Sequence, residues 1–164
     1  MNKTLNKMKN IIEQFINHNN IALIGVSRNP QKFGNALLKE LTKRGYTVYP
    51  VHPEMKEVEG SKCYASLDDL PEKVKNLLLV VQPHVTEQIV EQIDPQRIHR
   101  VWMHRGMGSG SASIKAIEEC KRKGIEVVYD FCPMMFVSQK GFHGFHFWMR
   151  KTFGQVPSEF KMTN

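Results

Sequence analysis

Short apolar runs recur along the chain at regular intervals, and each is followed by a turn of small or polar residues. Unbroken runs of this length are typical of strands that are buried on both faces of a parallel sheet. A further run, residues 46–51, is rich in β-forming side chains and contains Pro50. The pattern predicts five strands, at residues 21–24, 46–51, 76–81, 100–103 and 125–129.

Between these runs, apolar residues recur three or four positions apart, as they do on the buried face of a helix. Residues 5–16 form one such amphipathic pattern, and another begins near Phe33. Cap and stop residues predict three more helices. These are a short helix from Ser66 to Leu70, one opened by Pro83, and one that is capped by Ser111 or Ser113 and ended by Gly124.

Strands that alternate with helices through short connections imply a parallel sheet with right-handed crossovers. We therefore predict an α/β fold: a Rossmann-like, doubly wound sheet of five parallel strands in the order 3-2-1-4-5, with extra N- and C-terminal helices. In that order a ligand binds beyond the carboxyl ends of strands 1 and 4, where the strand order reverses. We expect one domain over residues 1–164, with an N-terminal helix at 1–17, a core at 18–137 and a C-terminal extension at 138–164.

The loop after the first strand carries the best candidate chemistry. Gly25 ends the strand, and small, polar and basic residues lead to the helix that starts near Phe33. A strand, a glycine turn and a helix N-terminus together bring backbone N–H groups to an anion. We interpret this loop as the phosphate-binding loop for an adenine nucleotide-like cofactor.

The residues around this loop argue against NAD. The dinucleotide fingerprint places a second glycine two residues after the first, where Ser27 stands here. NAD sites also place Asp or Glu at the end of the second strand, but this chain has Val51, His52 and Pro53. We expect Glu54, beyond the proline, to point elsewhere. Basic residues suit a phosphorylated ribose, as in NADP or coenzyme A, and four candidates are Arg28, Lys32, His52 and Lys56.

The net charge of +7 and the pI near 9.4 favour an anionic partner, although a solvated basic surface explains them equally well. No nucleic-acid partner is expected, because the sequence has no zinc-knuckle spacing, aromatic ribonucleoprotein signature or arginine-rich helix. Three scattered cysteines fit a reducing compartment. We see no signal peptide and no apolar run of the roughly 20 residues that a membrane span needs. We expect a soluble, cytoplasmic protein.

Five motifs then resemble the CoA-binding-domain proteins over residues 18–137: GVSRNPQKFGN, YPVHP, VVQP, VWMHRG and YDFCP, each at the end of a predicted strand. These are small, single-domain, Rossmann-like proteins related to the CoA-binding domain of the succinyl-CoA synthetase α subunit. The resemblance implies that the chain binds coenzyme A or an acyl-CoA. The cofactor-binding residues that it implies are Gly25, Val26, Ser27, Arg28, Lys32, Phe33 and Gly34 in the loop; His52 and Pro53 near the adenosine; Gln82 and Pro83 beside the ligand; and Arg105 and Gly106 along the pantetheine arm.

Other features leave alternatives open. The histidines lack partners at metal-ligand spacing, so we expect no metal site, and we find no catalytic motif. Cys132 is either a thiol that faces the cleft or a buried structural cysteine. The tail GFHGFHFWMRKTFG is either a helix packed on the protein, a dimer contact or a membrane-surface contact. Three functions follow: a CoA-binding module without chemistry of its own, an NADP-dependent oxidoreductase, or a basic interaction protein without a cofactor. Whether the chain forms a homo-oligomer stays open.

Overall fold

The computed structural model describes residues 3–105 and 110–137. Five parallel strands form one sheet: β1 (Asn20–Ile24), β2 (Thr47–Val51), β5 (Asn76–Leu79), β6 (Arg100–Met103) and β7 (Glu126–Val128). A small antiparallel pair, β3 (Glu57–Val58) and β4 (Ser61–Lys62), follows β2. The helices are α1 (Lys3–Ile16), α2 (Phe33–Lys43), α3 (Pro83–Gln92), α4 (Ile114–Arg122) and α5 (Met134–Val137). The α/β class and the five strands are as predicted.

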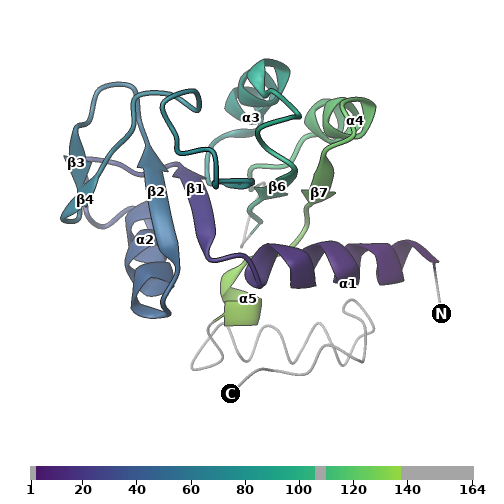
Figure 1. Cartoon of the computed structure of the whole chain (residues 1–164), viewed down its shortest axis with the longest axis horizontal. Coiled ribbons are helices and arrows are strands. Elements are labelled where there is room, and N and C mark those ends of the chain that lie inside the picture. The colour runs from purple at the N-terminus through teal and green to yellow at the C-terminus, as the bar shows by residue number, and fades with distance from the viewer. Residues whose placement is uncertain (1–2, 106–109, 138–164) are drawn as a thin grey trace.

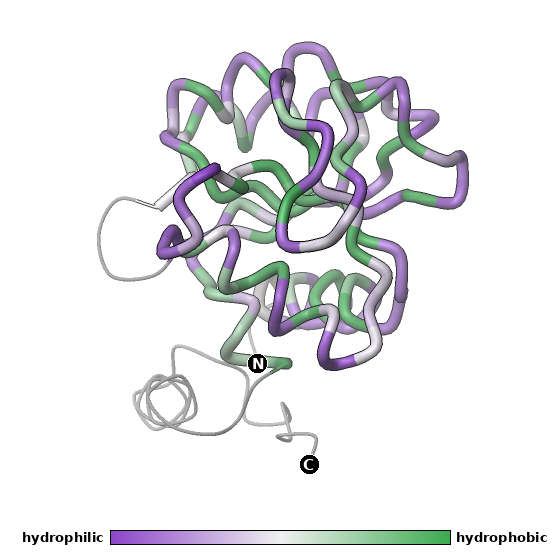
Figure 2. The backbone as a smooth tube through the Cα atoms, turned by 90° about the vertical axis from the view of Figure 1, so that its left-hand side faces the viewer, coloured by the Kyte–Doolittle hydropathy of each residue, from purple (hydrophilic) through white to green (hydrophobic). Residues whose placement is uncertain are grey.

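Helices cover both faces of the sheet, as the alternating pattern predicts. In Figure 1, α3 and α4 lie on one side of the sheet, and α1, α2 and α5 lie on the other. A hydrophobic core lies on each face of the sheet, and successive residues of a strand pack into opposite cores because side chains alternate along a strand. Leu78 packs in the core under α1 and α2, whereas Leu77 and Leu79 pack under α3 and α4. Figure 2 shows the hydrophobic segments gathered inside the hydrophilic ones.

The predicted strand order is wrong. The sheet runs β2-β1-β5-β6-β7, so the third main strand, β5, pairs with β1 on the inside and not with β2 on the outside. Pro50 gives the physical reason, because a proline within a strand favours the edge of a sheet. The carbonyl of Pro50 accepts a hydrogen bond from Tyr64 N on the outer side of β2. The missing N–H of Pro50 therefore faces away from β1, and β2 is an edge strand.

The short helix expected from Ser66 to Leu70 is also wrong, because these residues form turns. The Asp69 carboxylate accepts hydrogen bonds from both Ser66 N and Ser66 Oγ, which closes a turn in place of a helical cap. The other boundaries agree closely with the prediction. Ser113 caps α4 through Ala116 N, and Pro83 is the first residue of α3. The predicted aromatic tail and the 138–164 extension lie outside the described residues.

Buried polar contacts tie α1 to the sheet. The Asn76 amide donates to the carbonyl of Phe15, and the Tyr46 hydroxyl donates to the carbonyl of Ile16 at 2.7 Å. Both bonds satisfy carbonyls in the last turn of α1, which have no partner within the helix. They fix the end of α1 directly before β1 begins. These hydrogen bonds therefore hold the start of β1, and with it the strand that leads to the loop, in a fixed position.

Candidate functional site

Two glycines allow α2 to start directly on the turn that ends β1. Gly25 has φ +125°, and a Cβ at this position would lie 2.3 Å from the carbonyl oxygen of Val80. A Cβ on Gly34 would lie 2.0 Å from the carbonyl oxygen of Gly25. A side chain at Gly34 would push α2 away from the turn, and a side chain at Gly25 would collide with the backbone at the end of β5. This close approach places the N-terminus of α2 at the carboxyl ends of β1 and β5.

A buried amide holds the loop in shape. The Asn35 side chain is 1% exposed; its Oδ1 accepts from Ser27 N, and its Nδ2 donates to Ser27 O, both at 2.8 Å. The same Nδ2 donates to Glu59 at 3.1 Å, and Glu59 also pairs with Lys39 at 2.8 Å. The bonds from Lys39 and Asn35 hold the pKa of the Glu59 carboxyl below its usual value. Asn35 thus connects the loop, α2 and the β3–β4 turn.

Local turns order the exposed part of the loop. Asn29 N donates to Ser27 Oγ at 3.1 Å, Gln31 N donates to Asn29 Oδ1 at 2.9 Å, and Lys32 N donates to the Asn29 carbonyl. The chain reaches α2 through Lys32, which has an extended backbone conformation. As the first two residues of α2, Phe33 and Gly34 carry N–H groups that have no acceptor within the helix. This arrangement is suited to an anion.

A cleft of about 650 Å³ opens where these elements meet. Its floor is formed by the carboxyl ends of β1 and β5, because the observed strand order reverses between these two strands. The reversal of strand order that was expected between strands 1 and 4 therefore lies between β1 and β5, with β6 next to β5. The lining residues are Gly25, Ser27, Lys32, Phe33, Gly34, Val80, Val81, Gln82, Val85, His104, Gly110 and Ser111.

One wall of the cleft joins α2 to the end of β6. The rings of Phe33 and His104 are stacked, with centroids 4.5 Å apart and planes 16° apart. The His104 carbonyl accepts from Ser111 N at 2.7 Å, and Ser111 Oγ accepts from Val81 N at 3.0 Å. Among the residues that line the cleft, Lys32 and His104 are the two with titratable side chains. The cleft offers backbone donors and one flanking cation.

Six of the thirteen residues predicted to bind a cofactor line this cleft: Gly25, Ser27, Lys32, Phe33, Gly34 and Gln82. Val26 is buried in the core, and Pro83 begins α3 next to Gln82. Arg105 is exposed and forms an ion pair with Asp130. Gly106 lies outside the described residues.

Of the other predicted residues, His52 and Pro53 follow β2, and Arg28 lies on the loop after β1. His52 Nδ1 accepts from Glu54 N at 3.1 Å, and Pro53 is exposed. The expectation that Glu54 points elsewhere is wrong, because its carboxylate lies 3.5 Å from Arg28 on the loop after β1. The turn around His52 brings Glu54 back towards that loop. The ribose side expected from the sequence therefore carries an exposed ion pair and not only cations.

Cys132 is a buried cysteine and does not face the cleft. Its side chain is 1% exposed, and burial raises the pKa of its thiol to about 11. Its thiol therefore stays protonated near neutral pH, which does not suit a nucleophile. Among the described residues, no group of three His, Cys, Asp or Glu side chains is placed to hold a metal ion. No described helix is both long and apolar enough to cross a bilayer.

Sequence reasoning missed the most constrained polar residue of the site, Asn35. Within the first turn of a predicted helix, an asparagine is typical of an exposed position. Its partner, Ser27, lies eight residues away across the loop, so no helical pattern reveals the contact. One signal was present in the sequence: Asn35 directly follows Gly34, the glycine at which α2 contacts the turn after β1.

Comparison with known proteins agrees with this geometry. The family model for the CoA binding domain matches residues 19–138. The chain belongs to this family. A solved structure described as a hypothetical protein from Pyrococcus horikoshii is 33% identical, with a TM-score of 0.68, and the match covers 77% of this chain and 87% of that one. The family resemblance predicted from the five motifs is confirmed.

Curated relatives include larger enzymes. Acetate–CoA ligase (ADP-forming) I of Archaeoglobus fulgidus is 26% identical in a match that covers 85% of this chain and 20% of that protein. Subunit alpha of acetate–CoA ligase (ADP-forming) II of Pyrococcus furiosus is 35% identical over 79 residues, which are 48% of this chain and 17% of the subunit. The chain thus spans about a fifth of the length of these relatives.

Proposed function

We propose that this chain binds coenzyme A or an acyl-CoA in the cleft at the ends of β1, β5 and β6, as a binding or regulatory module without chemistry of its own. The observation that carries the proposal is the Asn35-clamped loop. It presents the first N–H groups of α2 to a cleft that Lys32 also lines. Membership of the CoA-binding-domain family supports coenzyme A or an acyl-CoA as the ligand class.

The diphosphate of the ligand is the group that this loop suits. Backbone N–H groups at a helix N-terminus bind anions, and the helix dipole adds to the attraction. Gly25 and Gly34 let the end of β5, the turn after β1 and the start of α2 pack closely together, which holds the first N–H groups of α2 at the cleft. Lys32 adds a positive charge at the same wall of the cleft. We propose that the stacked rings of Phe33 and His104 form the wall beside the diphosphate.

The phosphorylated ribose would lie towards Arg28. This guanidinium is 72% exposed and is held loosely by Glu54, so a ribose phosphate can replace the carboxylate as its partner. An ion pair between exposed groups contributes about 1 kcal/mol or less, which is a small barrier to that exchange. Coenzyme A carries a 3′-phosphate, and dephospho-CoA does not. We therefore expect coenzyme A to bind more tightly than dephospho-CoA.

A binding role without catalysis is proposed because the cleft brings together few groups that transfer protons. Its lining titratable side chains are Lys32 and His104, and the imidazole of His104 is stacked on Phe33. The curated relatives named above are ligases about five times longer than the matched region. We propose that this chain supplies ligand binding alone.

Calorimetric titration tests the proposal with coenzyme A, acetyl-CoA, dephospho-CoA, NADP and NAD as ligands. Coenzyme A is expected to bind at least about tenfold more tightly than NADP, a difference of about 1.4 kcal/mol. Lys32→Ala is expected to weaken coenzyme A binding, whereas Lys43→Ala, an exposed lysine at the far end of α2, should leave it unchanged. Tighter binding of NADP would support the oxidoreductase, and no binding of any nucleotide would reject a cofactor role.

A further inference from the structure

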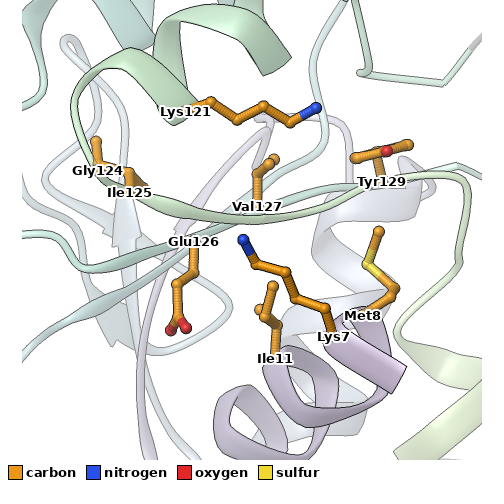
Figure 3. A pocket seen from close by; sticks show the side chains of 9 residues that line it. All are labelled: Lys7, Met8, Ile11, Lys121, Gly124, Ile125, Glu126, Val127 and Tyr129. Atoms are coloured by element: carbon orange, nitrogen blue, oxygen red, sulfur yellow. The ribbon is translucent and has the colours of Figure 1, made fainter. Parts of the chain in front are cut away.

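The outer edge of β7 is a second place where the described chain is open to a ligand. A cavity of about 540 Å³ runs along this edge, between α1 and the end of α4 (Figure 3). β7 is the last strand of the sheet, and within residues 3–105 and 110–137 no strand pairs with its outer side. The cleft proposed for coenzyme A is lined by different residues throughout. The edge is therefore a separate surface.

Backbone groups of β7 point into this cavity. Glu126 N donates to the carbonyl of His99, so the backbone of Glu126 faces β6. Because backbone groups alternate along a strand, the N–H and C=O of Val127 face outwards. Ile125 N already donates to the carbonyl of Cys120, so Val127 is the β7 residue that offers its N–H and C=O to another strand. The cavity beside Val127 is lined by apolar side chains on both faces of the sheet: Val127 and Tyr129 lie on the side of α4, and Met8 and Ile11 lie on the side of α1.

The charges at the edge are positive on both faces of the sheet. Lys121 of α4 lies above β7 and Lys7 of α1 lies below it in Figure 3. Glu126 is the acidic residue of the lining, and its carboxylate already lies 2.9 Å from Arg100 Nε. The two lysines thus remain to attract negative charge from outside the sheet.

We propose that this edge binds an extended, acidic segment of another protein, which adds a strand to β7. Main-chain hydrogen bonds to Val127 would fix the segment in place, as in other complexes that form by strand addition. Neighbouring residues of a strand face opposite sides of the sheet. Two adjacent acidic residues would therefore meet Lys121 on one side and Lys7 on the other, with apolar residues on either side of them.

Charge also distinguishes this occupant from the two others that the chain itself offers. If two copies paired edge to edge, the lysines of one copy would come close to those of the other. The chain beyond residue 137 is basic, with Lys140, Arg150, Lys151 and Lys161 against one acid, Glu159. Neither a second copy nor the segment beyond residue 137 supplies negative charge to pair with Lys7 and Lys121, so an acidic partner is favoured.

A titration followed by NMR tests this inference on the ¹⁵N-labelled full chain. The probe is a capped synthetic hexapeptide with two central glutamates and two apolar residues on each side. It is expected to shift the amide signals of β7 and to slow hydrogen exchange at the Val127 N–H at least about threefold. The same peptide with lysines in place of the glutamates should leave these signals unchanged.

Charge reversal provides the matched variants. Lys7→Glu combined with Lys121→Glu should abolish the response to the acidic peptide, whereas Lys43→Glu on α2 should retain it. Coenzyme A binding serves as the independent readout, because it is expected to stay the same in both variants. Equal responses to the two peptides, or no response at β7, would overturn the inference. A Val127 amide that is already protected from hydrogen exchange in the free chain would also overturn it. Sedimentation would then show whether a second copy of the chain covers the edge, which gives a dimer, or the chain's own terminal segment does, which leaves a monomer.

Discussion

At the scale of single residues, Asn35 is the buried side chain that holds the loop of the candidate site. Its amide satisfies both backbone groups of Ser27 and is almost fully buried. A buried donor or acceptor that loses its partner costs about 1–3 kcal/mol. Removing this one side chain takes the partner from two partly buried backbone groups of Ser27. The loop geometry therefore depends on a contact that secondary-structure patterns do not reveal.

Asn35→Leu tests this dependence, because leucine has a similar size but no hydrogen-bonding group. We expect the free energy of unfolding to fall by about 3 kcal/mol, and the affinity for coenzyme A to fall at least about tenfold. Urea denaturation and calorimetry measure the two effects. Asn29→Ala, which removes an exposed turn contact in the same loop, should cost less than about 1 kcal/mol. Equal losses of stability and affinity in the two variants would contradict the claim that Asn35 holds the loop in shape.

The cysteines give a second prediction at this scale. Burial raises the pKa of Cys132 to about 11 and that of Cys120 to about 12, so near neutral pH both are protonated thiols. A thiol with a pKa of about 11 is thiolate in on the order of one molecule in 10³ near pH 8. We expect iodoacetamide to modify them only after unfolding, as followed by mass spectrometry. Rapid labelling of Cys132 in the native chain would restore it as a candidate nucleophile.

At the scale of elements, the sequence predicts each main strand but not the place of β5. The apolar runs identify strands, because burial on both faces demands apolar residues at every position. Their order depends on which strands are internal, and that information lies in Pro50 of β2 and in the unbroken run of β5. β5 is buried at all four positions, whereas β2 begins with an exposed residue. Treating Pro50 as an edge signal would have excluded β5 from the outer side of β2.

The junction between β1 and α2 is the element-scale feature that carries the phosphate-loop interpretation. Gly34→Ala would place a Cβ 2.0 Å from the Gly25 carbonyl, so α2 must move away from the turn. We expect a loss of about 2 kcal/mol or more in stability, and a loss of most coenzyme A affinity. Both are read from denaturation and calorimetry on the same preparation.

Gly45→Ala is the control for that substitution. Gly45 has φ +91°, and no atom of the described residues lies within 4 Å of the position of a Cβ, so alanine there should cost about 1 kcal/mol through backbone strain alone. Its position after α2 is far from the cleft, and affinity should be unchanged. If Gly34→Ala also kept full affinity, the close approach of α2 would not matter for binding.

At the scale of the whole molecule, a net charge of +7 attracts anions to the surface in general. A basic surface alone does not distinguish coenzyme A from nucleic acid. The difference lies in how much of the binding is electrostatic, since binding to a nucleic acid backbone falls steeply with salt. A cleft that binds through backbone N–H groups and apolar contacts should depend on salt more weakly.

Salt dependence therefore separates the two kinds of partner. Between about 50 and 500 mM salt, we expect the dissociation constant of coenzyme A to rise less than about tenfold. Binding of a random DNA duplex, where it occurs at all, should fall by about 10³ or more over this range. Both are measured by titration on the same chain. A basic interaction protein would show the second behaviour and no measurable affinity for coenzyme A.

The most direct measurement of the central claim is a crystal structure of the chain with bound coenzyme A. We predict that the diphosphate accepts hydrogen bonds from backbone N–H groups of residues 25–34, beside the N-terminus of α2, with its oxygens within about 3.2 Å of these nitrogens. A diphosphate bound elsewhere, with this loop unoccupied, would contradict the account.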